Sequence, residues 1–350
     1  TNGISIDSNG LKYQGETDAK NVNYFTDGQT INIVYSGATK GWLPLEDDFV
    51  GFAPVAPATQ KGLFAYGQAS PQYNTRNLMN SSGVIAADAS GAGTGRNSIG
   101  ATTVGGDKGV YAFGTIGGSG NTNLSNKVTN QAVIATDTTG VGSARGAVGA
   151  SGFGGDKGIF GFGNAGPQNI TNLASNTGVI ATDTTGVGTA REGLAATEFG
   201  IDTCVFAYGG LADNLNMSNK VSNQGVVAAD TSGVGSFRWF TSAVSYGGDK
   251  GIFAWGASND PPSYLTRNLV SNTGVIGSDV STTSGTARHA SMAATYGGDK
   301  AAFAFATMNN PTRNLSTKNL VSNVGVISAD ITGVGTGRNA GAGIGYSFSA

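Results

Sequence analysis

The stretch GGDKGIFAWG, residues 247–256, decides the fold, because degenerate copies of it recur at intervals of 46 to 50 residues. Within it, Ile252 and Ala254 lie on one face of the expected strand, and Phe253 and Trp255 lie on the other. Both faces are apolar, which is typical of a strand in a sheet covered on both sides. The register of the six copies is marked by Lys61, Lys108, Lys157, Thr203, Lys250 and Lys300.

Each copy continues with a second apolar run that ends in an aspartate, as in GVIATD, residues 178–183. A turn rich in glycine follows, and glycine supplies the positive φ angles of tight hairpins. An arginine stands eight or nine residues after each aspartate, and a third strand then leads to the next copy. The repeating unit is therefore a small sheet of about 47 residues.

Sheets with two apolar faces must be covered by neighbours, and a closed ring of sheets covers all of them without a long exposed edge. Six copies predict an all-β, six-bladed β-propeller over residues 51–350. The last copy ends in a third strand after Gly337, whereas the first begins at Lys61 without one, so we expect the C-terminal strand to complete the first sheet. A parallel β-solenoid is the alternative, but its coils usually repeat at about 20 to 30 residues.

Residues 1–50 do not match the repeat and are expected to form a separate small β module for attachment. Alternating residues on either side of Asp27-Gly28 predict a hairpin there. The segment GWLPLEDD, residues 41–48, is expected to connect this module to the ring.

Composition narrows the class of protein. Charged residues make up 12%, the formal net charge is −2 and no cluster of lysine or arginine occurs, so we expect no nucleic-acid partner. No apolar run of about 18 residues predicts membrane insertion, and the first ten residues lack the features of a signal peptide, which indicates synthesis in a cytoplasm. Because Cys204 is the only cysteine, an intrachain disulfide and a multi-cysteine zinc site are excluded. We expect Cys204 to be a small buried hydrophobic residue.

The aspartate and the arginine of each unit flank one turn, so we expect them to face each other as a structural ion pair. Six near-equivalent pairs argue against catalysis, because an active site needs one asymmetric place. No dense loop of metal ligands surrounds the aspartate of Gly-Gly-Asp-Lys. We therefore expect no catalytic residue, metal, cofactor or enzymatic activity. The expected pairs are Asp88 with Arg96, Asp137 with Arg145, Asp183 with Arg191, Asp230 with Arg238, Asp279 with Arg288 and Asp330 with Arg338.

The copies differ most in the loops that follow the first strand, and we expect these loops to lie at one end of the scaffold, where a binding surface would be placed. Tyr73 and Tyr264 give this surface an aromatic component. The adjacent Trp239 and Phe240 stand where other units carry small residues, and they either form a sugar-stacking platform or pack in the core. His289, the only histidine, is expected to be a surface or turn residue.

The order of an arginine, Gly-Gly-Asp-Lys, Phe-x-Tyr-Gly and Val-Ile-Ala-x-Asp resembles the Kelch-like repeats of structural proteins of tailed phages, notably marine ones. This resemblance covers about residues 56–350. The stretch TDGQTINIVYSGATKGWLPLEDD, residues 26–48, is similar to a module of phage tail-fibre and other virion appendage proteins. Ordinary Kelch units carry Gly-Gly after the strand and a later tryptophan, whereas most copies here have one glycine and no repeated tryptophan.

The resemblance implies a non-enzymatic virion structural protein: a tail fibre, an appendage or a decoration protein. Its N-terminal module would bind other virion proteins, and its propeller would present variable loops to a bacterial surface glycan or protein. It further implies a location in the virion after synthesis in the host cytoplasm. Such appendages are commonly trimeric, but no coiled-coil heptads enforce a homo-oligomer here.

Two other functions share this fold. A secreted bacterial adhesin or lectin would carry the same propeller to an extracellular location. A propeller glycosidase would need a pair of carboxylates at one place, and the Ser-x-Asp-x-Gly-x-Thr-Trp box of sialidases is missing from the sequence.

Overall fold

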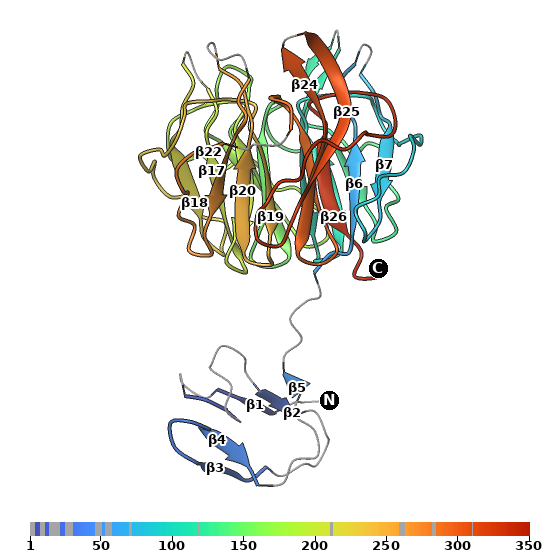
Figure 1. Ribbon diagram of the computed structural model, residues 1–350. Coiled ribbons are helices and arrows are strands. Elements are labelled where there is room, and N and C mark those ends of the chain that lie inside the picture. The colour runs from blue at the N-terminus through green and yellow to red at the C-terminus, as the bar shows by residue number, and fades with distance from the viewer. Residues whose placement is uncertain are drawn as a thin grey trace. The chain divides into compact units, whose positions relative to one another are not determined.

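The computed structural model describes residues 4–7, 11–13, 22–24, 31–45, 51–52, 58–69, 72–117, 119–210, 213–258, 263–281, 285–309 and 311–350. These residues form small antiparallel sheets, with no helix in the described part of the chain (Figure 1). The chain divides into two compact units, Thr1–Pro57 and Ala58–Ala350. We expected the boundary after residue 50, but Gly51–Phe52 pairs with a strand of the first unit.

The first unit consists of two small sheets, one with the order β1-β2-β5 and one formed by β3 and β4. Tyr13 is buried, and Ile6, Ile31 and Trp42 pack against it to form a small core. The strands are β1 (Ile4–Ile6), β2 (Val22–Tyr24), β3 (Ile33–Tyr35), β4 (Trp42–Pro44) and β5 (Gly51–Phe52).

The expected hairpin across Asp27-Gly28 is wrong. The strand before it, β2, pairs with β1 and β5, and the strand after it, β3, pairs with β4. Alternation in the sequence identifies strands but does not choose their partners, because the same pattern suits any neighbour that buries one face. Asp27 and Gly28 lie outside the described residues, as do residues 46–48 of the expected connector, whose Trp42–Pro44 portion is strand β4.

The second unit contains six sheets that follow one path. In five of them the Gly-Gly-Asp-Lys turn or its variant joins a first strand to an antiparallel second strand, and in the sixth the first strand is the C-terminal strand of the chain. In each sheet a variable loop leads from the second strand to an antiparallel third strand. The first strands are β26 (Ala342–Tyr346), β8 (Gly100–Val104), β13 (Gly149–Phe153), β16 (Ala195–Phe199), β19 (Ser242–Tyr246) and β23 (Met292–Tyr296).

The second strands carry the apolar motif that marks the repeat, and four of their five residues are buried in most sheets. The second strands are β6 (Lys61–Ala65), β9 (Lys108–Ala112), β14 (Lys157–Gly161), β17 (Thr203–Ala207), β20 (Lys250–Ala254) and β24 (Lys300–Asn309). The third strands are β7 (Arg76–Met79), β12 (Ser125–Val128), β15 (Thr171–Ala174), β18 (Ser218–Val221), β21 (Thr266–Val270) and β25 (Thr312–Val321).

Three departures from the expected repeat are visible. The second apolar run of each unit touches the third strand through isolated bridges, such as Val128 with Ile134, instead of a regular ladder. The loop expected after Thr307 is an extension of β24 and β25, which rise beyond the other sheets in Figure 1. The short strands β10 (Thr115–Ile116), β11 (Gly120–Asn121) and β22 (Val280–Ser281) lie outside the common path.

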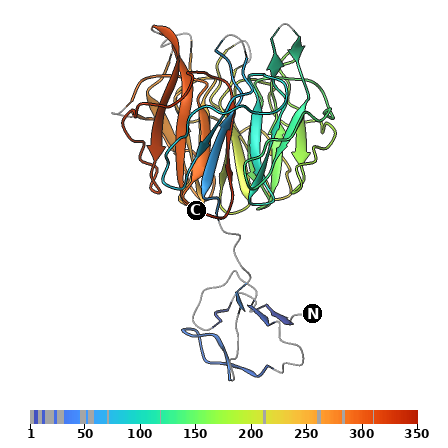
Figure 2. The same cartoon turned by 90° about the vertical axis from the view of Figure 1, so that its right-hand side faces the viewer.

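The C-terminal strand completes the first sheet, as expected. β26 pairs with β6 in an antiparallel register from Ala342 opposite Ala65 to Tyr346 opposite Lys61. The first sheet is thus assembled from the two ends of the second unit (Figures 1 and 2).

Each sheet packs on its neighbours through an apolar cluster, and there are six such clusters between sheets in the described residues. The last and the first sheet meet in the same way as the others: Phe305 and Phe64 are fully buried, with ring centroids 5.9 Å apart. Full burial of a phenylalanine side chain stabilises the folded state by about 1.5 to 3 kcal/mol. The first strands contact one another in the order β26, β8, β13, β16, β19, β23 and back to β26.

Six backbone hydrogen bonds join the loops just before the first strands in a closed cycle. Each N–H donates to the carbonyl of the equivalent residue one unit earlier, over 2.6 to 3.0 Å, and Ser98 closes the cycle by donating to Ala340. All six residues have positive φ, between 46° and 62°. The six are Ser98, Ala147, Gly193, Phe240, Ala290 and Ala340.

Candidate functional site

Each repeated arginine is buried between two neighbouring sheets. Arg145 is fully buried; its Nε donates to the carbonyl of Phe162 over 2.8 Å and its Nη2 donates to Oδ1 of Asn172 over 2.6 Å. Its Nη1 lies 3.8 Å from Oδ1 of Asp183. The opposite face of the guanidinium covers the ring of Phe113 in the preceding sheet, with Cζ 4.1 Å from the centroid. One side chain therefore links two sheets by hydrogen bonds and a cation–π contact.

The pairing that we expected within one turn is corrected by the structure. Each arginine contacts the aspartate of the following unit through one nitrogen, at 3.3 to 3.8 Å. The reason is that the glycine-rich segment crosses from one sheet to the next, so the residues at its two ends belong to different sheets. The observed pairs are Arg96 with Asp137, Arg145 with Asp183, Arg191 with Asp230, Arg238 with Asp279, Arg288 with Asp330 and Arg338 with Asp88.

A buried asparagine on each third strand belongs to this arrangement and was missed from the sequence. Its amide donates to the aspartate at 2.8 to 3.0 Å, and in five sheets its oxygen accepts from the arginine. A signal was present, because the asparagine always stands eleven residues before the aspartate. The six are Asn77, Asn126, Asn172, Asn219, Asn268 and Asn319.

The two charged groups of a pair remain ionised at neutral pH. Burial lowers the pKa of Arg145 to about 10, which leaves the guanidinium protonated at pH 7. Burial by itself would raise the pKa of Asp183, but hydrogen bonds from Ser143 and Asn172 and the charge of Arg145 bring it below its usual value. The pairs are therefore structural contacts between sheets.

We predict that Arg145→Met destabilises the second unit by about 3 kcal/mol. The reason is that Asp183, whose side chain is only 28% exposed, loses the cation that balances its charge. Urea unfolding of the full chain measures this change. Lys157→Met is the matched control, since the Lys157–Asp156 pair is 49% and 41% exposed and should contribute less than about 1 kcal/mol. Equal effects of the two substitutions would contradict a structural role for the buried pair.

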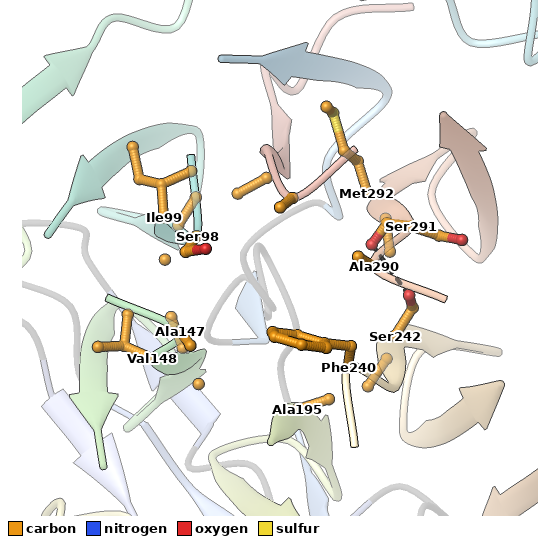
Figure 3. Close-up of a pocket in the computed structure, with 18 of the residues that line it drawn as sticks. Ser98, Ile99, Ala147, Val148, Ala195, Phe240, Ser242, Ala290, Ser291 and Met292 are labelled. Carbon is orange, nitrogen blue, oxygen red and sulfur yellow. Dashed lines mark hydrogen bonds between the residues drawn. The ribbon is translucent and has the colours of Figure 1, made fainter. Parts of the chain in front are cut away.

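A pocket of about 140 Å³ lies inside the cycle of backbone hydrogen bonds and is lined by residues from all six sheets (Figure 3). Five of the six residues of the cycle are serine, alanine or glycine, and the sixth is Phe240. The ring of Phe240 projects into the pocket in Figure 3. The pocket is therefore asymmetric although its walls are repeated. Its lining comprises residues 98–101, 147–150, 193–196, 240–243, 290–293 and 340–343.

Two more aromatic side chains adjoin Phe240. The ring of Trp239 lies 4.8 Å from that of Phe240 at 34°, and the ring of His289 lies 6.4 Å from it at 30°. Nδ1 of His289 is 3.2 Å from Oγ of Ser263. We name Trp239, Phe240 and His289 the axial aromatic site.

Two residues of this site, Trp239 and His289, directly follow a repeated arginine, and every unit has a residue at that position. Each of these residues forms a backbone bridge to the start of a variable loop, as Trp239 does with Ala257 and His289 does with Thr307. The six loops lie at one end of the second unit, as expected (Figure 1). Unlike the neighbouring arginines, the six residues at this position are of five different types. They are Asn97, Gly146, Glu192, Trp239, His289 and Asn339.

Glu192 is the acidic member of this set. It pairs with Gly210, and an added Cβ on Gly210 would lie 3.5 Å from Cε3 of Trp239. Its Oε2 is buried and has no hydrogen-bond partner among the described residues. Burial raises the pKa of Glu192, and a hydrogen bond from Asn164 opposes that rise. An unsatisfied buried oxygen of this kind is a marker of a missing polar partner.

The candidate residues named from the sequence are only partly brought together. Trp239 and Phe240 are in contact, and Tyr264 lies beside Ser263, the partner of His289, with its hydroxyl 3.3 Å from Oγ of Ser258. Tyr73 lies in the loop of the first sheet. His289 was expected to be a surface or turn residue, and the structure makes it part of the aromatic site.

Other chemistry is limited in the described part of the chain. No group of three or more histidine, cysteine, aspartate or glutamate side chains there could hold a metal ion. Cys204 is a free, buried thiol that packs in an apolar cluster, as expected, and burial raises its pKa. Among these residues no helix has the length and apolar character needed to cross a membrane.

No family model and no curated protein matches this chain.

The single histidine allows a pH test of this geometry. Burial lowers the pKa of His289 below its ordinary value of 6.5, so below that pH the unfolded chain binds more protons than the folded chain. We predict that the free energy of unfolding falls more steeply from pH 7 to pH 5 in the natural chain than in His289→Gln. Urea unfolding at each pH measures it, and an identical slope would show that His289 is solvated.

Proposed function

We propose that residues 58–350 form a six-bladed β-propeller and that the protein is a non-enzymatic binding protein whose axial aromatic site binds a glycan. The propeller is supported by the cyclic order of contacts between first strands, the closed cycle of backbone hydrogen bonds and the pairing of β26 with β6. A ring of blades covers both faces of every sheet, which fits the apolar clusters between all neighbouring sheets.

The observation that carries the binding function is the contact of Trp239 and His289 with Phe240 at one side of the pocket. Aromatic faces stack on the apolar faces of sugar rings and exclude water there. The unpaired oxygen of Glu192, whose backbone pairs with Gly210 beside Trp239, would accept a hydrogen bond from a sugar hydroxyl. Apolar surface with a few placed polar groups is the usual composition of a small-molecule site.

We propose that the protein binds the glycan without cleaving it. A glycosidase places two carboxyl groups on either side of the scissile bond. The described residues that line the pocket include no carboxylate. The site thus resembles a lectin site more than a hydrolytic one.

We further propose that the setting is a virion of a tailed phage, as a tail fibre, an appendage or a decoration protein. The support for this setting is the sequence resemblance of the repeats and of residues 26–48. In such a particle the first unit would bind other virion proteins, and the axial aromatic site would face a bacterial surface glycan. A secreted adhesin would use the same site in the same way.

We predict that the full chain binds a subset of bacterial surface polysaccharides and that Phe240→Ala and Trp239→Ala each weaken that binding at least about tenfold, or about 1.4 kcal/mol. A polysaccharide array followed by biolayer interferometry measures the affinities. Tyr35→Ala is the matched control, since Tyr35 is an exposed aromatic side chain of the first unit. Unchanged affinity in both variants, or absence of binding to every glycan, would contradict the proposal.

A further inference from the structure

A second feature of the axis is the carboxylate of Glu198. Glu198 is the fourth residue of β16, and it follows Ala196, which lines the axial pocket, by two positions. Alternate residues of a strand point to the same side and are about 6.6 Å apart. Glu198 therefore lies one layer deeper along the axis than the pocket. At the equivalent positions the other first strands carry Thr103, Gly152, Ser245, Thr295 and Gly345.

The neighbouring first strand leaves room for this carboxylate. A Cβ on Gly152 would collide with Oε1 of Glu198, so the side chain of Glu198 occupies space that the glycine vacates. Of the thirty residues in the six first strands, Glu198 is the only one with a charged side chain. The combination of one carboxylate and one facing glycine breaks the sixfold repetition at this layer.

The carboxylate has no cation beside it in the described residues. No ion pair there includes Glu198, and its polar contact is with Oγ of Ser245, 3.5 Å from Oε2. The side chain is accessible to solvent, although the enclosing protein raises its pKa.

The repeat that carries Glu198 has also lost its lysine. Thr203 stands where the other five units have lysine at the Gly-Gly-Asp-Lys turn, and its hydroxyl donates to the carbonyl of Phe199 over 2.6 Å. The same unit therefore gains a negative charge and loses a positive one. In four other units this lysine pairs with the aspartate of its own turn, so its loss removes a partner of the turn and not of Glu198.

We propose that the axial space beside Glu198 binds a primary ammonium group, supplied by an amino sugar or by a lysine side chain of a partner protein. One carboxylate balances one positive charge, whereas calcium takes six to eight oxygen ligands, commonly several carboxylates. An ammonium group has three N–H donors, which can be shared between Glu198 and the hydroxyl oxygen of Ser245. This site goes beyond the axial aromatic site and uses different residues.

The chain offers a direct probe, because it contains four glutamates: Glu16, Glu46, Glu192 and Glu198. Full chain labelled with carbon-13 at the glutamate carboxyl gives four resonances, and Glu198→Gln assigns the one of interest. We expect ethylammonium chloride at pH 8 to shift the Glu198 resonance saturably. Sodium chloride and tetramethylammonium chloride at the same concentrations should produce no saturable shift.

Two variants separate the site from general effects. Gly152→Ala fills the vacated space and should weaken ethylammonium binding at least about tenfold, while Glu192→Gln should leave it unchanged. A response to sodium equal to that to ethylammonium, or unchanged binding in Gly152→Ala with its fold intact, would overturn the proposal.

The source of the ammonium group and the relation to glycan binding are tested on the same resonance. Glucosamine and Nα-acetyl-lysine amide are titrated side by side; tighter binding of either supports the site and names the source, and saturation by neither overturns it. Phe240→Ala should keep the ethylammonium response. If the natural chain binds no glycan but still shows the ethylammonium response, the axial aromatic site has failed and the ammonium site at Glu198 stands.

Discussion

A buried guanidinium at each junction between neighbouring sheets is the interaction on which the second unit depends. Arg145 and its five equivalents are at most 1% exposed, and each meets an aspartate of the following unit on one side and an aromatic ring of the preceding sheet on the other. Burying a charge is costly unless it is paired and hydrogen-bonded. The sheets must therefore hold their relative positions closely enough to keep each of the six guanidinium groups beside its aspartate, which makes the scaffold around the axis rigid.

That rigidity explains how sequence variation can be concentrated at a few positions. The residue next to each arginine is fixed by the same contacts, so its side chain can vary without loss of the fold. At Trp239 and His289 this freedom gives aromatic rings, and two residues after Arg238 it gives Phe240 in a cycle otherwise made of small residues. The same principle applies deeper along the axis, where Glu198 replaces a small residue opposite Gly152.

Much of the fold could be predicted because the repeat is strong. The apolar second strands, their six copies and the completion of the first sheet by the C-terminal strand follow from the alternation of Gly-Ile-Phe-Ala-Trp and from the unequal ends of the repeats. The partner of each arginine could not be found in this way, because sequence distance favoured Asp137 for Arg145, whereas the crossing between sheets places Asp183 there. The contribution of His289 depended on its contact with Phe240, and a lone histidine carries no signal of such a contact. The strand β2 was also assigned to the wrong neighbour, because alternation in the sequence identifies a strand but does not choose its partner.

The most direct test of the account is the fluorescence of Trp239 during glycan binding. The chain has three tryptophans, of which Trp255 is fully buried, so Trp42→Phe leaves Trp239 as the one partly exposed tryptophan. The account predicts a saturable change in emission with the same midpoint as binding measured independently on the polysaccharide. Binding to the polysaccharide without any change in the Trp239 emission would contradict a site at the axis.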